Sequence, residues 1–140
     1  MGKFFSNLKS IKINNIVLIL ILLLLFIIFK YCTYCLIFYE HNVPTSTLWN
    51  CEVTTTKKVL NSGFIIGNSK IERLSRDKLV KIRQLVKELK ENVKNLEQKA
   101  NVSNRFTIDG KTYAENSLDS EGKEILSQIL TIIYGYNYHI

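Results

Sequence analysis

The feature that most constrains this chain is a run of fourteen apolar residues without a break, Ile16 to Phe29. From Ile16 to Tyr39 the only charged side chain is Lys30. A helix over that stretch would be about 36 Å long, enough to cross a hydrocarbon core of roughly 30 Å. A chain of 140 residues could not bury such a segment in a soluble core. We therefore expect a membrane-spanning segment within 13–39, with its helix running from Ile13 to about Ile37.

A cleaved signal peptide is the alternative interpretation of this segment. Lys3, Lys9 and Lys12 give it a basic region ahead of an apolar core. However, no pair of small residues suited to a cleavage site follows, because the chain there reads Phe-Lys-Tyr-Cys-Thr-Tyr-Cys. Lys30 can extend its charged end towards the membrane surface, where tyrosines are also favoured. The sequence therefore favours a retained anchor.

The charges on either side of the apolar run predict its orientation. Three lysines and no acid lie in the basic N-terminal segment, 1–12, whereas Glu40 and Glu52 are the first charges after the run and Lys30. Lysine-rich flanks stay in the cytoplasm. We expect a single-pass protein with a cytoplasmic N-terminus and the rest of the chain across the membrane.

Three residues near the membrane are candidates for lipidation. Gly2 lies in the pattern Met-Gly-x-x-x-Ser, which is typical of N-myristoylation but also arises by chance. Cys32 and Cys35 form a C-x-x-C pair that could be acylated, although two apolar packing residues are the favoured interpretation. A redox site would need a βαβ context and a zinc site a second pair. The sequence predicts no metal or cofactor.

Beyond the span, 40–68 is predicted to hold a linker followed by a β-hairpin. His41 to Ser46 includes Pro44, the only proline, and is interpreted as the linker. Leu48 to Leu60 is rich in β-branched residues, and an Asn-Ser-Gly turn separates it from Gly63 to Ile66. Such a turn between two β-prone runs is typical of a hairpin.

A long amphipathic helix is predicted over 69–101, with Ser69 capping its start through a Ser-x-x-Glu box. Its apolar residues recur at intervals of three and four, as in a coiled coil. This seam consists of Leu79, Ile82, Val86, Leu89, Val93, Leu96 and Ala100. The flanking charges do not favour a parallel dimer, so three interpretations stay open: self-association, a protein partner, or packing on the chain's own C-terminal helix.

The charge of the predicted helix raises the question of nucleic-acid binding. Lys70 to Lys99 holds ten bases and five acids, 10 − 5 = +5, within a chain of net charge +7. No aromatic residue lies between Phe64 and Phe106, so this element lacks platforms for base stacking. Basic side chains that alternate with acids are typical of a solvated helix face. Nucleic acid is therefore not favoured, and lipid or an acidic protein partner fits better.

The last segment, 102–140, is predicted to form a short hairpin and a C-terminal helix. Asp109-Gly110 between alternating apolar residues favours a type I′ turn. Ser117 to Glu121 supplies capping residues and acids for a helix that should end near Tyr134-Gly135. Asn101, just before this segment, lies in the only Asn-x-Ser/Thr sequon of the sequence. This sequon is either a glycosylation site or a chance match.

The residues of 108–126 carry a resemblance to known sequences. The chain reads Ile108-Asp109-Gly110-Lys111-x-Tyr113 and then Leu-Asp-Ser-Glu-Gly-Lys-Glu-Ile-Leu. This stretch resembles a short module of uncharacterised phage and bacterial proteins with the pattern IDGKxY…LSxExKxxL. The resemblance implies a hairpin–helix packing unit and no activity.

The sequence offers no set of catalytic residues. Its two histidines, His41 and His139, lie far apart, and no P-loop, G-x-G-x-x-G or H-E-x-x-H motif is present. We expect a non-enzyme: one transmembrane helix plus a small α+β, mainly helical, domain with a coiled-coil-like helix. The predicted function is a membrane-anchored structural or interaction protein, with a viral membrane or capsid-anchoring component as the sharper hypothesis. The alternative is a small accessory subunit of a membrane enzyme or transporter complex.

Overall fold

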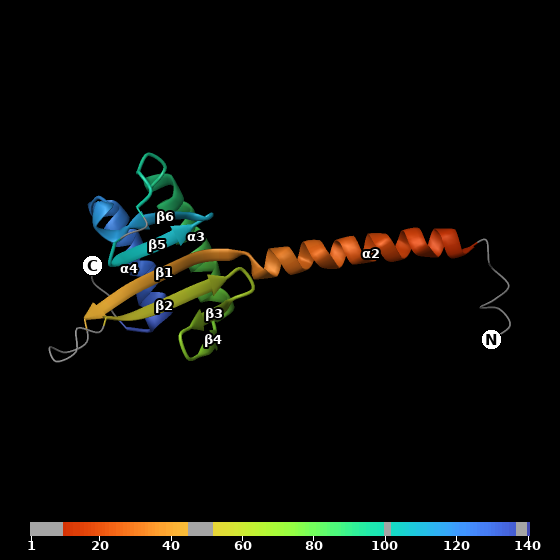
Figure 1. Cartoon of the computed structure of the whole chain (residues 1–140), viewed down its shortest axis with the longest axis horizontal. Helices are drawn as coiled ribbons and strands as arrows, with labels where there is room; N and C mark the ends of the chain where they lie inside the picture. Colours follow the sequence, from red (N-terminus) through yellow and green to blue (C-terminus); the bar gives the residue numbers. More distant parts are fainter. Residues whose placement is uncertain (1–9, 45–51, 100–101, 137–139) are drawn as a thin grey trace. The chain divides into compact units, whose positions relative to one another are not determined.

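The structure is a computed structural model that describes residues 10–44, 52–99, 102–136 and 140. The chain divides into two compact units, Met1–Thr33 and Tyr34–Ile140. The first contains helix α2, Ser10–Thr33. The second contains every strand described here and the helices α3 and α4 (Figure 1).

From Ile16 to Phe29, helix α2 is apolar on all sides. The large apolar side chains from Ile16 to Phe29 are all between 47% and 62% exposed. The stretch Asn14–Thr33 is long and apolar enough to cross a membrane. A helix that is hydrophobic all round is either enclosed by protein or immersed in lipid.

The helix ends earlier than the sequence predicts. Its last turn closes with a hydrogen bond from the Thr33 hydroxyl to the Phe29 carbonyl, 2.8 Å. Strand β1, Cys35–Pro44, begins two residues later. The expected continuation of the helix to Ile37 is wrong because Ile37 and Tyr39 pair with β2 and are fully buried in the second unit.

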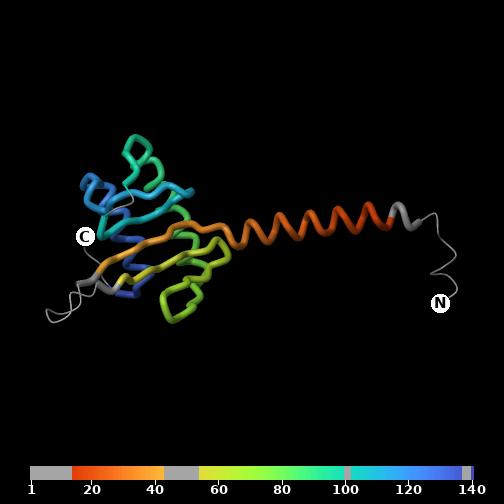
Figure 2. The backbone as a smooth tube through the Cα atoms, viewed as in Figure 1, coloured from red at the N-terminus to blue at the C-terminus, as the bar shows by residue number. Residues whose placement is uncertain are grey.

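The second unit is built on one antiparallel sheet in the order β4-β3-β2-β1-β5-β6. Its two central strands are β1 and β2, and the latter spans Glu52–Leu60. The remaining strands are β3 (Phe64–Gly67), β4 (Ile71–Arg73), β5 (Asn104–Ile108) and β6 (Lys111–Ala114). The tube in Figure 2 follows β1 through the middle of this sheet, with shorter strands on either side.

Two tight turns set the pairing of the outer strands. The β2–β3 turn needs a left-handed residue, which Gly63 supplies with φ 96°. The β5–β6 turn has positive φ at both central residues, 51° at Asp109 and 73° at Gly110. Those two positive values define the type I′ turn that the sequence predicts here.

The two long helices of the second unit cover one face of the sheet (Figures 1 and 2). Helix α3 spans Arg76–Asn92, and α4 spans Ser120–Tyr134 after a short 3₁₀ turn, Glu115–Ser117. The Asp119 carboxylate caps α4 by accepting a hydrogen bond from the Gly122 N–H at 2.7 Å. At its other end, Gly135 adopts the left-handed conformation typical of a helix C-cap.

The hydrophobic core lies between the sheet and these two helices. Among its fully buried side chains are Tyr39, Phe106 and Val59 from the sheet, and Leu89 and Ile129 from the helices. Because strand side chains alternate between faces, every second residue of β1, Ile37 and then Tyr39, faces the helices. All buried apolar side chains described here belong to the second unit.

The structure corrects the expected fold class. A mainly helical domain with a coiled-coil-like helix is wrong, since the domain is an α+β fold whose largest element is a six-stranded sheet. The Ser-x-x-Glu box that begins at Ser69 does not start a helix, because Ile71–Arg73 forms strand β4. The true cap is Ser75, whose hydroxyl accepts from the Lys78 N–H at 3.4 Å. The helix it caps ends at Asn92.

The seam of the predicted coiled coil lies in the domain's own core. Ile82, Val86, Leu89 and Val93 are at most 3% exposed, and Leu79 and Leu96 pack against the same core while partly buried. Ala100 lies outside the described residues. The heptad spacing therefore reflects one helix packing on a sheet and on α4, which needs the same apolar face as a coiled coil. Ile82, Val86, Leu89 and Val93 are thus covered within the domain.

The expected linker after the span is also corrected. Most of it, from His41 to Pro44, belongs to β1, which pairs with β2 over Cys35–Pro44. Proline is tolerated here because β5 pairs with β1 only as far as His41, so at Pro44 the strand is paired on one side, with β2.

Candidate functional site

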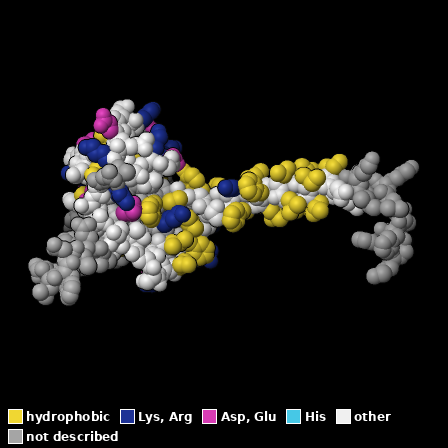
Figure 3. All heavy atoms as spheres, in the orientation of Figure 1, with side chains coloured by type: hydrophobic (Ala, Val, Ile, Leu, Met, Phe, Trp, Pro, Cys, Tyr) yellow, Lys and Arg dark blue, Asp and Glu magenta, His cyan; other side chains and the backbone are white. Residues whose placement is uncertain are grey.

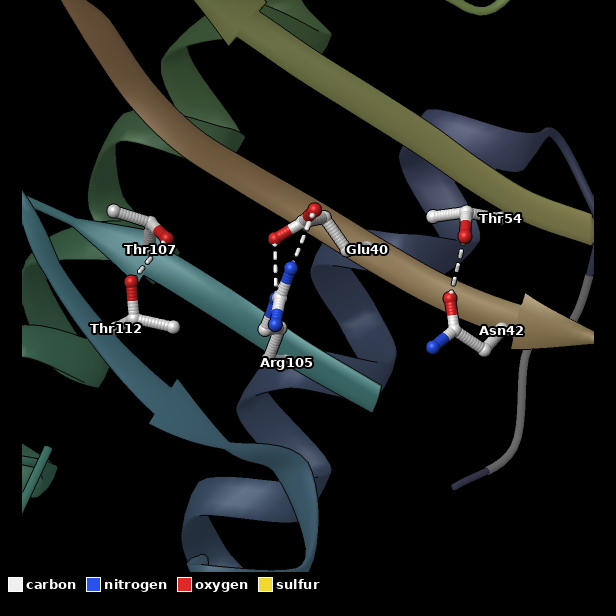
Figure 4. Close-up of polar contacts among 6 residues, drawn as sticks. All are labelled: Glu40, Asn42, Thr54, Arg105, Thr107 and Thr112. Atoms are coloured by element: carbon white, nitrogen blue, oxygen red, sulfur yellow. Dashed lines mark hydrogen bonds and ion pairs between the residues drawn. The ribbon is translucent and has the colours of Figure 1, made fainter. Parts of the chain in front are cut away.

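The face of the sheet opposite the helices carries no covering element among the described residues. Figure 4 looks onto this open face, with the helices behind the strands. The side chains on it come from the strand positions that alternate with the core, such as Phe38 and Glu40 on β1. An uncovered sheet face in a small domain is the natural surface for contact with another molecule.

Six polar side chains of this face pair with one another across neighbouring strands (Figure 4). They are Glu40, Asn42, Thr54, Arg105, Thr107 and Thr112, and we call this set the polar ladder. The Thr107 and Thr112 hydroxyls are 2.9 Å apart, and the Thr54 hydroxyl donates to Asn42 Oδ1 at 2.8 Å. Such cross-strand pairs fix side-chain positions as well as strand register.

The centre of the polar ladder is a two-point ion pair between β1 and β5. Arg105 donates from Nε to Glu40 Oε2 at 2.6 Å and from Nη2 to Glu40 Oε1 at 3.1 Å. The hydrogen bond to Glu40 raises the pKa of the Arg105 guanidinium above its ordinary value. The two parallel hydrogen bonds hold the guanidinium and the carboxylate in a planar, ordered arrangement.

Beside the polar ladder lies an exposed apolar strip formed by Phe64, Ile66 and Ile71. These side chains, from β3 and β4, are 40%, 37% and 68% exposed. The Arg73 guanidinium lies 5.7 Å from the centre of the Phe64 ring, and Lys58 pairs with Ile66 in the register. Figure 3 shows hydrophobic and basic side chains gathered together over this part of the sheet. The apolar strip is thus flanked by positive charge.

A separate hollow of about 390 Å³ lies where β5 meets the 3₁₀ turn. It is lined by Val102, Ser103, Asn104, Glu115 and Asn116. At its side the Tyr39 hydroxyl donates to Glu115 Oε2 at 2.6 Å. Within the described residues, Asn104 Oδ1 is buried without a hydrogen bond. The hollow is polar, and it can hold water or a small polar group.

The described part of the chain holds no group of three or more His, Cys, Asp or Glu side chains that could bind a metal ion. The polar ladder consists of an ion pair, hydroxyls and an amide that are already hydrogen-bonded to each other. Such an arrangement, next to an exposed apolar strip, is suited to binding the surface of another macromolecule.

The structure separates the residues that the sequence singled out. Cys32 lies in the last turns of α2 and Cys35 at the start of β1, and both are free thiols. Burial raises the pKa of the Cys35 thiol, which disfavours its reactive thiolate form. Gly2 and Asn101 lie outside the described residues, so their modification stays a prediction.

No sequence motif marks the polar ladder. Glu40 and Arg105 are 65 positions apart, and neither lies in a recognisable motif. The local signal for it is the alternation of side chains in 35–44, but the same residues also fit the end of a membrane span and a linker.

Together these features define an α+β domain, with one open sheet face, that follows a helix long and apolar enough to cross a membrane. The chain matches no protein-family model, no curated protein and no solved structure.

Proposed function

We propose that this protein is a membrane-anchored interaction protein. Helix α2 is the anchor, and the domain of 34–140 binds a protein partner through the apolar strip and the polar ladder. The observation that carries the proposal is that the core of the domain is complete without α2. No residue of α2 belongs to this core, and the apolar side chains from Ile16 to Phe29 are 47–62% exposed.

The energetics of α2 support a retained anchor. Leaving a Leu or Ile side chain in water instead of burying it costs about 1.5–3 kcal/mol. Between Ile16 and Phe29 every residue is apolar, so the total cost in water, about 20–40 kcal/mol, exceeds the stability of a small domain, about 5–15 kcal/mol. A signal sequence has the same length and apolarity, but the chain after α2 lacks small residues for cleavage.

The surroundings of the apolar strip favour a partner that is apolar at its centre and acidic at its rim. Phe64, Ile66 and Ile71 offer the apolar area, and Lys58 and Arg73 lie beside them. Interfaces commonly combine an apolar centre with a polar rim, and opposite charges speed association.

The N-terminal lysines support a cytoplasmic N-terminus, with the domain on the opposite side of the membrane. Protease treatment of sealed membrane vesicles tests this orientation. In inside-out vesicles the domain should be protected, whereas in right-side-out vesicles it should be digested. The opposite pattern would reverse the proposed orientation.

Site-specific photocrosslinking tests the partner surface in intact membranes. A photoreactive residue at Ile71, in the apolar strip, should crosslink a defined partner, and the charge-introducing change Phe64→Asp should abolish the adduct. The matched control position is Val80, which is 54% exposed and lies on α3, in the helix layer. Equal adducts from both positions, or adducts that Phe64→Asp leaves intact, would contradict the proposal.

Replacement of 13–33 by polyleucine separates this proposal from the accessory-subunit alternative. If the domain binds the partner, the Ile71 adduct should survive the replacement. If the span itself makes the specific contacts, for example through Lys30, the adduct should disappear. Extraction with alkaline carbonate checks the anchor directly, since a membrane-spanning chain should stay in the pellet.

A further inference from the structure

A pocket lined by three lysines lies beside the β5–β6 turn, where Ile108 and Lys111 follow the Thr107–Thr112 pair of the polar ladder in the register. Its volume is about 160 Å³, and it is formed by the end of α3 and the β5–β6 turn. The lining side chains are Lys90, Val93, Lys94, Ile108, Asp109, Lys111 and Tyr113. One water needs roughly 10–15 Å³, so a group as large as a phosphate fits. We call it the lysine pocket.

The lysine pocket has an apolar floor and a charged rim. Val93, Ile108 and Tyr113 are at most 6% exposed and belong to the core. Three ammonium groups and one carboxylate surround this floor, 3 − 1 = +2. The single acid, Asp109, pairs with Lys90 at 2.9 Å. Within the described residues, neither Lys94 nor Lys111 forms an ion pair, so two charges are left for an anion.

The lysine pocket is connected to the residue at which the chain leaves α2. The Lys90 ammonium lies 3.5 Å from the Tyr34 hydroxyl and 5.8 Å from the centre of its ring. Tyr34 directly follows Thr33, the last residue of α2, and consecutive Cα atoms are about 3.8 Å apart. When α2 spans a membrane, Tyr34 must therefore lie at its surface, where tyrosine is favoured.

We propose that the lysine pocket binds the phosphate of an anionic lipid in the membrane that holds α2. The proposal rests on the anchoring part of the proposed function. Lysine-lined pockets suit lipid phosphates, which face both sides of a bilayer, because an ammonium–phosphate pair is screened less where water is partly excluded. The bound headgroup would also restrict the orientation of the domain at the membrane surface.

Native mass spectrometry of the full chain in mild detergent tests this site. The probes are phosphatidylglycerol, which is anionic, and phosphatidylcholine, which has a phosphate but no net charge. The wild-type chain should retain phosphatidylglycerol preferentially. Each lysine near an anionic headgroup raises the binding constant for the lipid roughly fivefold. The double variant Lys94→Ala/Lys111→Ala should therefore lose about twenty-five-fold in this preference.

Two further variants make the test specific. Lys78→Ala/Lys81→Ala removes the same charge from exposed positions of α3 outside the pocket and should leave the preference unchanged. Asp109→Asn removes the only acid of the pocket and should raise the preference severalfold. Circular dichroism of each variant checks that the domain is folded. Equal losses from both double variants, or no preference in the wild type, would overturn the proposal.

A competition arm distinguishes the two sources of phosphate. Inorganic phosphate, added at the concentration of the lipid, should fail to displace phosphatidylglycerol if the acyl chains and the membrane surface contribute. Displacement at equal concentration would assign the pocket to a free phosphate and overturn the lipid assignment. Failure of the anchor has a separate readout. If alkaline carbonate extracts the chain from membranes, α2 is not a membrane anchor, whatever the lipid measurements show.

Discussion

Glu40 and Arg105 join the first four strands of the domain, β1 to β4, to the last two, β5 and β6. They lie opposite each other on β1 and β5, and two hydrogen bonds of 2.6 Å and 3.1 Å connect them across the open face. The side chains of Glu40 and Arg105 are 16% and 33% exposed, so they are partly shielded from solvent without being fully buried. This pair links the strands nearest the start of the domain to those nearest its end.

Breaking this ion pair should destabilise the domain moderately. A double-mutant cycle of Glu40→Gln and Arg105→Met in the full chain should give a coupling free energy of about 1 kcal/mol, because the pair is well aligned but partly solvated. Thermal unfolding in detergent, followed by near-ultraviolet circular dichroism of the buried tyrosines, measures it. A coupling indistinguishable from zero would mean that the pair orders the surface without stabilising it.

Leu89→Ala should destabilise the domain by about 2–5 kcal/mol, since Leu89 is fully buried and its removal leaves a cavity. The exposed Val80→Ala on the same helix should change the unfolding free energy by about 0.5 kcal/mol or less. The same unfolding measurements test both. If Leu89→Ala left the fold intact and only dissociated an oligomer, the seam would be an interface after all.

Gly122→Ala should destabilise α4, the reverse of the usual effect of this change inside a helix. A Cβ at Gly122 would collide with the Asn92 side chain, which donates to the Asp119 carboxylate at 3.2 Å. We expect a loss of about 1–2 kcal/mol. Gln128→Ala, at an exposed position of α4, is the control. A gain in stability at Gly122 would show that Asn92 moves aside at no cost.

Asp119 should make the stability of the domain depend on pH in the acid range. Hydrogen bonds, first from the Gly122 N–H and then from Asn92, lower the pKa of the Asp119 carboxyl below its ordinary value. Its contribution to stability is therefore present above the unfolded pKa, about 3.9, and is lost as the pH falls through the lower folded pKa. The melting temperature of wild type should fall more steeply below pH 4 than that of Asp119→Asn. Parallel curves would exclude Asp119 as the cause.

Local signals in the sequence predicted the turns and the last helix. The Asp109-Gly110 pair predicted its turn because few residues accept positive φ. The helix expected to end near Tyr134-Gly135 does end there, since Gly135 supplies the left-handed cap. These features depend on neighbouring residues only, so a single sequence is enough to find them.

The predictions failed where distant contacts decide the structure. The stretch from Cys35 to Pro44 has apolar and aromatic residues that suit a helix end, a strand or a membrane interface equally well. This stretch forms a strand because it pairs with β2 on one side and with β5 on the other. Likewise, Ile71–Arg73 is strand β4 because β3 supplies its hydrogen-bond partners, although its local sequence fits a capped helix.

By itself, the sequence determined that Ile16 to Phe29 forms a helix suited to a membrane, because an unbroken apolar run leaves no other low-energy arrangement. Only the tertiary structure decided what the heptad-like seam of α3 contacts. An apolar stripe at spacings of three and four needs a hydrophobic surface, but the stripe does not specify which surface. Here the sheet and α4 cover Ile82 and Leu89 within the same domain, and the polar and apolar groups of the opposite sheet face are left exposed.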